Sequence, residues 1–239
     1  MKKYDWEKLE KIGEGGEKRV YKNPSNPEST LLRLKEQVRI SEKKMKAGFY
    51  FSKILHLLFP KNIPDIHMAG TSHGENVADV EFKNLDEEHK ALNKSASVFN
   101  KEGVKTNKIG AQFFDSGYGK AKQKLSAKLY ADPQYEIFVQ KMRELEVSVD
   151  AFVGNFGHDE SGNLIYVDSN FRPWSVNNLD DQDSSVKPSP RYFYDRNKLL
   201  GAIDKLSETD KKKATTYLER VEELAEEDLR IAIKNKGKN

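Results

Sequence analysis

The sequence predicts an α+β fold, with short strands in the first third of the chain and helices in most of the rest. Up to residue 82, apolar residues occur mainly in short alternating runs separated by glycine and proline, as in antiparallel strands. One helical pattern, at residues 39–58, lies among these strands. After about residue 130 the apolar residues recur at the spacing of amphipathic helices. We place the boundary between the two parts near residue 84, so that they span residues 1–84 and 85–239.

The composition is that of a polar globular protein. The 239 residues are 36% hydrophobic and 33% charged, and 41 basic against 38 acidic side chains leave a formal net charge of +3. Such a balance gives no reason to expect a nucleic acid or a membrane as partner. The chain has no cysteine, which excludes disulfides and thiolate catalysis. Because no apolar leader follows Met1 and no run approaches roughly 18 apolar residues, we expect a cytoplasmic protein.

Residues 148–168 carry the clearest chemical pattern and read SVDAFVGNFGHDESGNLIYVD. Two short apolar runs flank the turn residues 159–162, which predicts a tight hairpin. Asn155 and Asp168 would lie side by side at its open end, where an amide oxygen and a carboxylate suit Mg²⁺. Asp150 precedes them, close enough to accept a proton from a hydroxyl. The structural alternative is that Asp150 caps a turn and Asp168 only ends a strand.

A glycine-rich run near the start of the chain is the second motif. Residues 12–22 read IGEGGEKRVYK, with glycines at Gly13, Gly15 and Gly16 between two predicted strands. Glycine lets the backbone come close to a phosphate with its amide groups turned inward. An ordinary glycine hairpin is the alternative. A dinucleotide-binding fold is disfavoured, because no helical pattern follows the glycines.

In this order along the chain, the two motifs resemble the protein kinase superfamily. Asp150 and Asn155 have the spacing of the catalytic loop H-R-D-x-x-x-x-N, and Asp168 stands where the Asp of Asp-Phe-Gly follows the hairpin. The glycine run is similar to I-G-x-G-x-x-G-x-V-Y-K. More faintly, Gly-Glu-Gly-Gly followed by Leu-Arg-Leu resembles inositol polyphosphate kinases. The resemblance covers about residues 10–170.

Several positions depart from the kinase pattern. Lys18 stands in place of the third glycine, Ser148 and Val149 replace His-Arg, and Ser169 and Asn170 replace Phe-Gly. The lost third glycine, the missing His-Arg and the uncertain helix carboxylate favour a pseudokinase-like module that binds a nucleotide or a partner without turnover. The retained Asp150, Asn155 and Asp168 favour an active enzyme, and an unrelated α+β domain with chance motifs is the third possibility.

The resemblance implies a two-lobed protein kinase-like fold, with a β-rich N-lobe and a short helical C-lobe. It implies ATP and Mg²⁺ as ligands, and transfer of the γ-phosphoryl group to a hydroxyl of a protein or a small molecule. Asp150 would orient the acceptor and take its proton, while Asn155 and Asp168 would hold Mg²⁺. The glycine run would cover the phosphates. The sequence does not identify the acceptor.

The resemblance also implies a cation on the strand at residues 30–35, reaching the α and β phosphates. Arg33 and Lys35 share one face of this strand with Leu31, and both remain candidates. Its partner would be Glu42, the only acid of the helix, or another carboxylate, or the ion pair is absent. Two further strands are expected at residues 63–70 and 77–82. The second leads into a hinge at Glu81 and the residues up to 84, whose backbone would bind adenine.

The remaining predictions concern secondary structure. Helices are expected at residues 133–147, 194–206 and about 207–234, the last opening on a capping box. Residues 84–130 are polar, with a plausible helix at 86–101 and a short strand at 111–114. The polar run that ends near residue 190 is expected to be a flexible loop.

Overall fold

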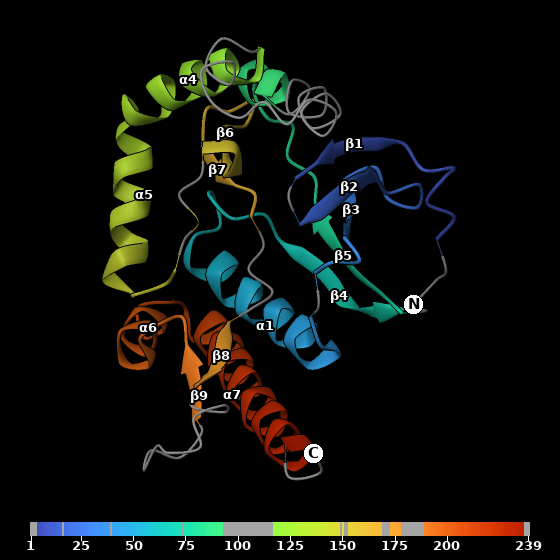
Figure 1. Ribbon diagram of the computed structural model, residues 1–239. Coiled ribbons are helices and arrows are strands. Elements are labelled where there is room, and N and C mark those ends of the chain that lie inside the picture. The colour runs from blue at the N-terminus through green and yellow to red at the C-terminus, as the bar shows by residue number, and fades with distance from the viewer. Residues whose placement is uncertain are drawn as a thin grey trace.

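The computed structural model describes residues 4–15, 17–38, 40–72, 74–92, 117–148, 150, 153–168, 173–177 and 189–236. It confirms the α+β class: a five-stranded antiparallel sheet forms the N-terminal part, and helices dominate the C-terminal part (Figure 1). Within these ranges, no helix is both long enough and apolar enough to cross a membrane. Gly16, the predicted strand at 111–114 and most of the predicted helix at 86–101 lie outside the described residues.

The N-terminal sheet has the order β1-β2-β3-β5-β4, with every neighbouring pair antiparallel. Its strands are β1 (Lys11–Glu14), β2 (Lys18–Lys22), β3 (Ser29–Leu34), β4 (Ile66–Ser72) and β5 (Glu75–Glu81). In β2 and β3, Lys18 lies opposite Leu34 and Val20 opposite Leu32. Because directly opposed residues share a face, Lys18, Val20, Leu32 and Leu34 lie on one side of the sheet.

This side of the sheet packs against helix α1 (Glu42–Leu58). Leu32 and Leu34 join Met45 of α1 in a small apolar core. The helix begins later than the sequence pattern suggested, because the Ser41 hydroxyl accepts the Lys44 amide at 3.2 Å and so caps it. The α1 helix thereby covers one face of the sheet.

The C-terminal part has four α-helices that lie wholly within the described residues and two pairs of antiparallel strands, and residues 87–92 are helical as well. In order these elements are α4 (Gly117–Tyr130), α5 (Pro133–Glu144), β6 (Phe156–His158), β7 (Leu164–Tyr166), β8 (Trp174–Asn177), β9 (Ser189–Tyr192), α6 (Arg196–Ile203) and α7 (Glu208–Lys236). The predicted helices at 133–147, 194–206 and 207–234 correspond to α5, α6 and α7. The β6–β7 hairpin lies between the five-stranded sheet and helices α4 and α5 (Figure 1).

Two elements of this part differ from the sequence predictions. Helix α4 buries only Leu125, Leu129 and Gly119, so its apolar pattern is too sparse to recognise. The two ends of the run expected to be a flexible loop pair as β8 and β9, with Trp174 opposite Tyr192. Trp174 is 1% exposed, so burial of this side chain accounts for an ordered strand in a polar stretch.

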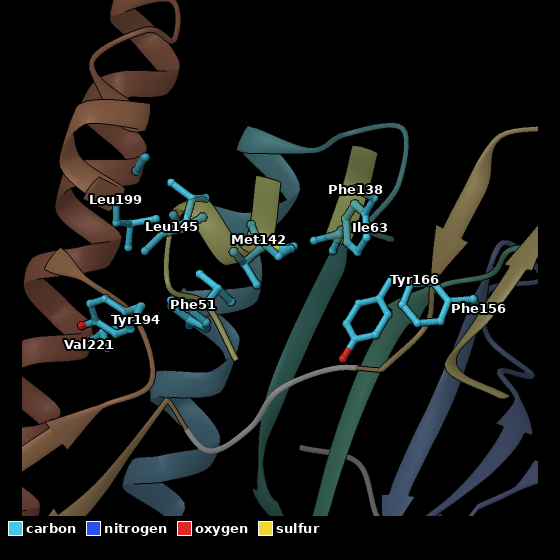
Figure 2. Packing of buried hydrophobic residues seen from close by; sticks show 14 of the residues in the cluster. Phe51, Ile63, Phe138, Met142, Leu145, Phe156, Tyr166, Tyr194, Leu199 and Val221 are labelled. Carbon is cyan, nitrogen blue, oxygen red and sulfur yellow. The ribbon is translucent and has the colours of Figure 1, made fainter. Parts of the chain in front are cut away.

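A large apolar core joins the two parts of the chain. Phe51 of α1 stacks on Tyr194 with 5.1 Å between ring centroids, and Val221 of α7 lies in the same cluster. Phe138 of α5 contacts Phe156 and Tyr166 of the β6–β7 hairpin (Figure 2). Helix α1 therefore packs against the sheet with one side and against the C-terminal helices with the other.

Candidate active site

The β6–β7 hairpin forms as predicted. Phe156 pairs with Tyr166, and the Asp159 carboxylate accepts the amides of Ser161 and Asn163 at 2.9 Å each. Gly162 completes the turn with a φ of 76°, which glycine adopts without strain. At the open end, the Val167 amide donates to the carbonyl of Asn155 at 2.8 Å. The backbone thus places residues 155 and 168 next to each other, as expected from the spacing.

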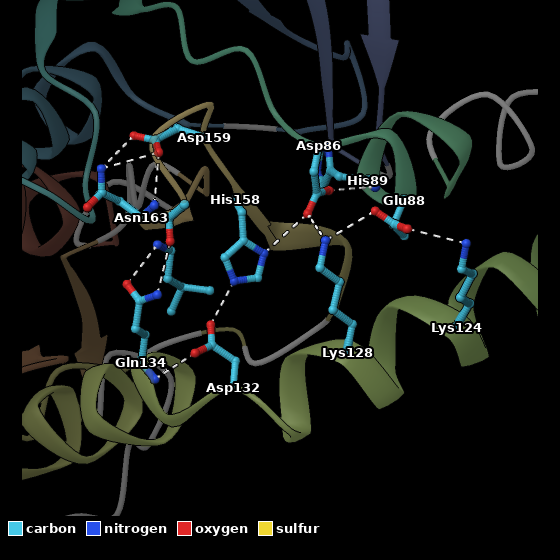
Figure 3. A network of polar contacts seen from close by, with 12 residues as sticks. Asp86, Glu88, His89, Lys124, Lys128, Asp132, Gln134, His158, Asp159 and Asn163 are labelled. Carbon is cyan, nitrogen blue, oxygen red and sulfur yellow. Dashed lines mark hydrogen bonds and ion pairs between the residues drawn. The ribbon is translucent and has the colours of Figure 1, made fainter.

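Two histidines hold β6 at its two ends, and Figure 3 shows the network of polar contacts around His158. His158 lies 2.7 Å from Asp132, the cap of α5, and 3.2 Å from Asp86. Lys128 of α4 pairs with Asp86 at 2.7 Å. His89 donates from Nε2 to the carbonyl of Gly154 at 2.9 Å. These contacts tie β6 and the turn before it to α4, α5 and residues 86–89.

Asp150 and Asn155 lie close together ahead of the hairpin. The Asn155 amide nitrogen donates to the carbonyl of Asp150 at 3.2 Å. This contact uses the nitrogen and leaves the amide oxygen of Asn155 as the atom that can bind a cation. The Asp150 residue is exposed to solvent.

Tyr166 is a site residue that the sequence patterns did not reveal. Its hydroxyl lies 3.5 Å from the Asp168 carboxylate. Burial, together with the negative charges of Asp168 and Asp150, raises the pKa of Tyr166 well above its usual value. The phenol therefore stays protonated and acts as a donor beside Asp168. Only the position of Tyr166 two residues before Asp168, on the same strand face, could have indicated this role.

Lys18 is the second site residue that was missed, and it connects the sheet to the hairpin. Its ammonium group forms an ion pair with the Asp168 carboxylate, and the two side chains are 17% and 26% exposed. Lys18 reaches Asp168 because it lies on the face of the sheet that α1 also covers. The alternation of β2 after the glycine turn was a possible signal, since it places Lys18 on the same side as Val20.

Arg33 and Lys35 lie away from Asp168. Arg33 pairs with Glu75 at 2.5 Å and lies 5.2 Å from the centre of the Trp6 ring, while Lys35 pairs with Glu14 at 3.0 Å. Arg33 does share a face with Leu31, as expected, but this is the face opposite to α1. Neither cation contacts Asp168, and their role as phosphate ligands stays a prediction that this placement does not favour.

Glu14 gathers several cations at the glycine turn. Lys11, Lys35 and Arg19 lie 2.7, 3.0 and 3.4 Å from its carboxylate. Burial opposes ionisation of Glu14, but the hydrogen bonds and charges of Lys11 and Lys35 outweigh it and lower its pKa to about 2. The carboxylate is thus ionised at physiological pH, and the turn has more positive than negative side chains around it.

Glu42 does not pair with a strand cation. It lies exposed in the first turn of α1 and forms an ion pair with Lys46 at 2.8 Å, one helical turn away. The partners of Arg33 and Lys35 are instead Glu75 and Glu14, which belong to the sheet itself. The expected helix–strand ion pair is therefore not formed by Glu42.

Several polar groups of the segment predicted to be a hinge are already bonded to other parts of the protein. The Glu81 carboxylate contacts Lys83 at 2.5 Å and accepts the Asp65 amide at 3.0 Å. The backbone amides of Glu81 and Phe82 donate to the carbonyls of Asp65 and Glu28, both at 2.7 Å. These two amides are consequently committed to the sheet, and adenine recognition by this segment stays a prediction.

The glycine turn closes on itself. The Gly15 amide donates to the Lys18 carbonyl at 2.9 Å. A Cβ atom added at Gly15 would meet nothing within 4 Å, and one added at Gly13 would lie 3.6 Å from Val20, an ordinary contact. The folded chain thus does not itself require glycine at either position. Any requirement would come from a ligand that approaches the turn.

The donor set at the hairpin fits Mg²⁺ that is shared with phosphates. Among the residues that the structure describes, no group of three or more His, Asp or Glu side chains is arranged to hold a metal ion. Mg²⁺ usually needs only one or two protein carboxylates, with water and substrate phosphates completing the octahedron. Asn155 and Asp168 supply one amide oxygen and one carboxylate, which agrees with such a site.

A small cavity lies beside Asp168. Ser52 and Leu55 of α1, Ser148, Tyr166 and Asp168 contribute to its wall, and its volume is about 20 Å³. That space holds one water molecule and is far too small for a nucleotide. A nucleotide would therefore have to lie outside this cavity, or enter only after Lys18 and Asp168 separate.

Comparison with known proteins assigns this chain to no family. Neither the models of known protein families nor the curated proteins give a match to this chain. A function for this chain therefore has to be inferred from the geometry of the site.

Proposed function

We propose that the protein is an ATP- and Mg²⁺-dependent phosphotransferase of protein kinase-like fold. It would transfer the γ-phosphoryl group to a hydroxyl of a protein or a small molecule. The proposal includes a β-rich N-lobe, residues 1–84, and a helical C-lobe, residues 85–239. The observation that carries it is the β6–β7 hairpin, which brings Asp150, Asn155 and Asp168 together opposite a cation of the sheet.

Each side chain has a role that its environment supports. Asp150 is exposed at the loop before the hairpin, where its carboxylate orients an acceptor hydroxyl and takes its proton. The oxygens of Asn155 and Asp168 hold the cation, which neutralises phosphate charge when it is bound. Tyr166 donates toward Asp168 and fixes the orientation of that carboxylate.

A module that binds nucleotide without turnover is the second candidate. The Lys18–Asp168 ion pair occupies the carboxylate that should hold the metal, and the cavity beside it admits only water. With both features, the site around Asp168 is closed to a nucleotide. The enzyme and the binding module differ in phosphoryl transfer and not in nucleotide affinity.

The test compares Asp150→Ala with Asp168→Asn. Asp150→Ala should keep its affinity for Mg·ATP and lose transfer by ~10²–10⁴-fold, the usual contribution of a positioned base. Asp168→Asn should lose both. Transfer is measured with labelled ATP and a cell extract resolved into protein and small-molecule fractions, and affinity by calorimetry.

An exposed carboxylate of α5 provides the control. Glu136→Ala should leave affinity and transfer unchanged. Wild-type protein that binds Mg·ATP but labels nothing would favour the binding module. Wild-type transfer by Asp150→Ala would show that Asp150 is structural.

A further inference from the structure

We infer that Lys18, and not Arg33 or Lys35, is the cation that contacts the phosphates of the bound nucleotide. In the structure, Lys18 forms an ion pair with Asp168. Asp168 would hold Mg²⁺ together with Asn155, and Lys18 would then leave Asp168 and contact the phosphates. This inference rests on the proposed function and names the residue that completes its nucleotide site.

The register of the sheet determines which cation faces the hairpin. Lys18 is opposite Leu34, and the leucines of this face pack against Met45 of α1. Arg19 is opposite Arg33 on the other face, where Arg33 is held by Glu75 and Trp6. Turning Arg33 toward the hairpin would require a shift of one residue in β3. That shift would move Leu32 and Leu34 out of the core, so the sheet does not permit it.

The position of Lys18 in the turn suits a phosphate ligand. Its carbonyl accepts the Gly15 amide, which anchors its backbone at the end of the glycine turn. Its side chain crosses from there to the open end of the β6–β7 hairpin. An ammonium group on a flexible stem has three donors and can change partners without movement of the backbone. A phosphate between the glycine turn and Asp168 would therefore lie within reach of Lys18.

Charge explains why the exchange is coupled to the metal. The Lys18 and Asp168 side chains are both mostly shielded from solvent, so separating them would leave a carboxylate without its cation. Bound Mg²⁺ would supply that positive charge at Asp168, and the phosphates would supply a negative charge for Lys18. Metal and nucleotide should consequently bind together much better than either binds alone.

The first experiment compares Lys18→Met with Lys35→Met. Loss of Lys18 should weaken Mg·ATP binding by about 10- to 100-fold, the effect expected for a hydrogen bond to a charged group. Adenosine, which has no phosphates, should bind equally well to Lys18→Met and to the wild type. Lys35→Met should bind Mg·ATP within about threefold of the wild type, since its partner is Glu14. Affinities are measured by calorimetry, with thermal melting as the check on folding.

The second measurement tests a change in affinity in the opposite direction. Without nucleotide, Lys18 competes with the metal for Asp168, so Lys18→Met should bind Mn²⁺ alone more tightly than the wild type. Mn²⁺ is used as the probe because its binding can be followed by electron paramagnetic resonance. A merely structural lysine would not weaken binding of one ligand and strengthen binding of the other. If Lys18→Met does not fold, Lys18→Gln replaces it, since Gln still donates a hydrogen bond but has no charge.

The outcomes separate this inference from the proposed function. If the wild type binds Mg·ATP and Lys18→Met binds it equally well, Lys18 is not the phosphate cation, but the phosphotransferase proposal stands. The same conclusion follows if only Lys35→Met or Arg33→Met loses affinity. If the wild type binds no Mg·ATP, the proposed function is wrong and the role of Lys18 is wrong with it.

Discussion

At the scale of single residues, the Asp168 carboxylate is stabilised by two neighbouring side chains. Lys18 reaches it from the sheet and the Tyr166 hydroxyl approaches it from its own strand. Together they compensate the negative charge in a partly buried place, where an isolated carboxylate would be costly. Asp168 thus has two polar partners from different parts of the fold, while Asp150 lies exposed on the loop before the hairpin.

Also at the scale of single residues, the burial of His89 predicts how the stability of the protein depends on pH. The side chain is 6% exposed, and burial lowers its pKa, although its bond to Gly154 and the nearby Asp86 act in the opposite direction. The folded protein thus favours neutral His89, whereas the unfolded chain takes up a proton near pH 6.5. The stability from neutral His89 is complete above about pH 6.5 and is lost as the pH falls toward the lowered pKa of the folded state.

Urea denaturation between pH 5 and 8 measures this effect. His89→Gln keeps an amide that can donate to Gly154, but it cannot titrate. The variant should be less stable at pH 8, because the imidazole is buried, and its stability should change less between pH 7 and 5. His67→Gln serves as control, since His67 is exposed on β4. An equal pH dependence in wild type and His89→Gln would contradict the prediction.

At the scale of elements, the β6–β7 hairpin depends on its turn. Gly162 has a φ of 76°, and a methyl group added there would meet no atom within 4 Å. A side chain at this position would therefore cause strain only through the backbone conformation. Gly162→Ala should lower the free energy of unfolding by about 1 kcal/mol, the cost of a left-handed residue with a Cβ. The loss is measured by chemical denaturation.

Helix α6 provides a matched glycine for comparison. Gly201 lies exposed within the helix, also without neighbours within 4 Å of an added methyl group. Gly201→Ala should raise stability by up to ~1 kcal/mol, because alanine favours helix. The two substitutions add the same methyl group and should act in opposite directions. Equal effects would show that the turn conformation at Gly162 is not as described.

At the scale of the whole molecule, helix α1 is the element that both parts share. Its N-terminal end is bound to the long C-terminal helix by Lys43 with Glu227 and by Lys44 with Asp228. Its middle contributes Phe51 and other apolar residues to the core that contains α6 and α7. We therefore expect the sheet and the C-terminal helices to unfold as one cooperative unit.

Leu218→Ala tests this cooperativity. Leu218 of α7 is 1% exposed, and its truncation should cost about 2–5 kcal/mol. If unfolding is cooperative, hydrogen exchange will quicken in β3 and β5 as well as in α7. Ile231→Ala on the same helix is the control, since Ile231 is 46% exposed and should matter little. Unchanged protection of β3 and β5 in Leu218→Ala would mean that the two parts unfold separately.

Local sequence patterns predicted the structure correctly where the interacting residues are close in sequence. The hairpin between Asn155 and Asp168 follows from two short apolar runs and a turn with glycine, because pairing of adjacent strands depends on few residues. The helices at residues 133–144 and 208–236 follow from apolar spacing and their caps. The α+β class follows from the same patterns.

The tertiary structure alone decided which charges meet. Alternation along β3 placed Arg33 and Lys35 on one face, but only the packing of α1 shows that the opposite face meets the hairpin. Lys18 and Asp168 are 150 positions apart, and no local pattern relates them. The physical reason is that burial of leucines against α1 orients the sheet, and that orientation determines which cation reaches Asp168.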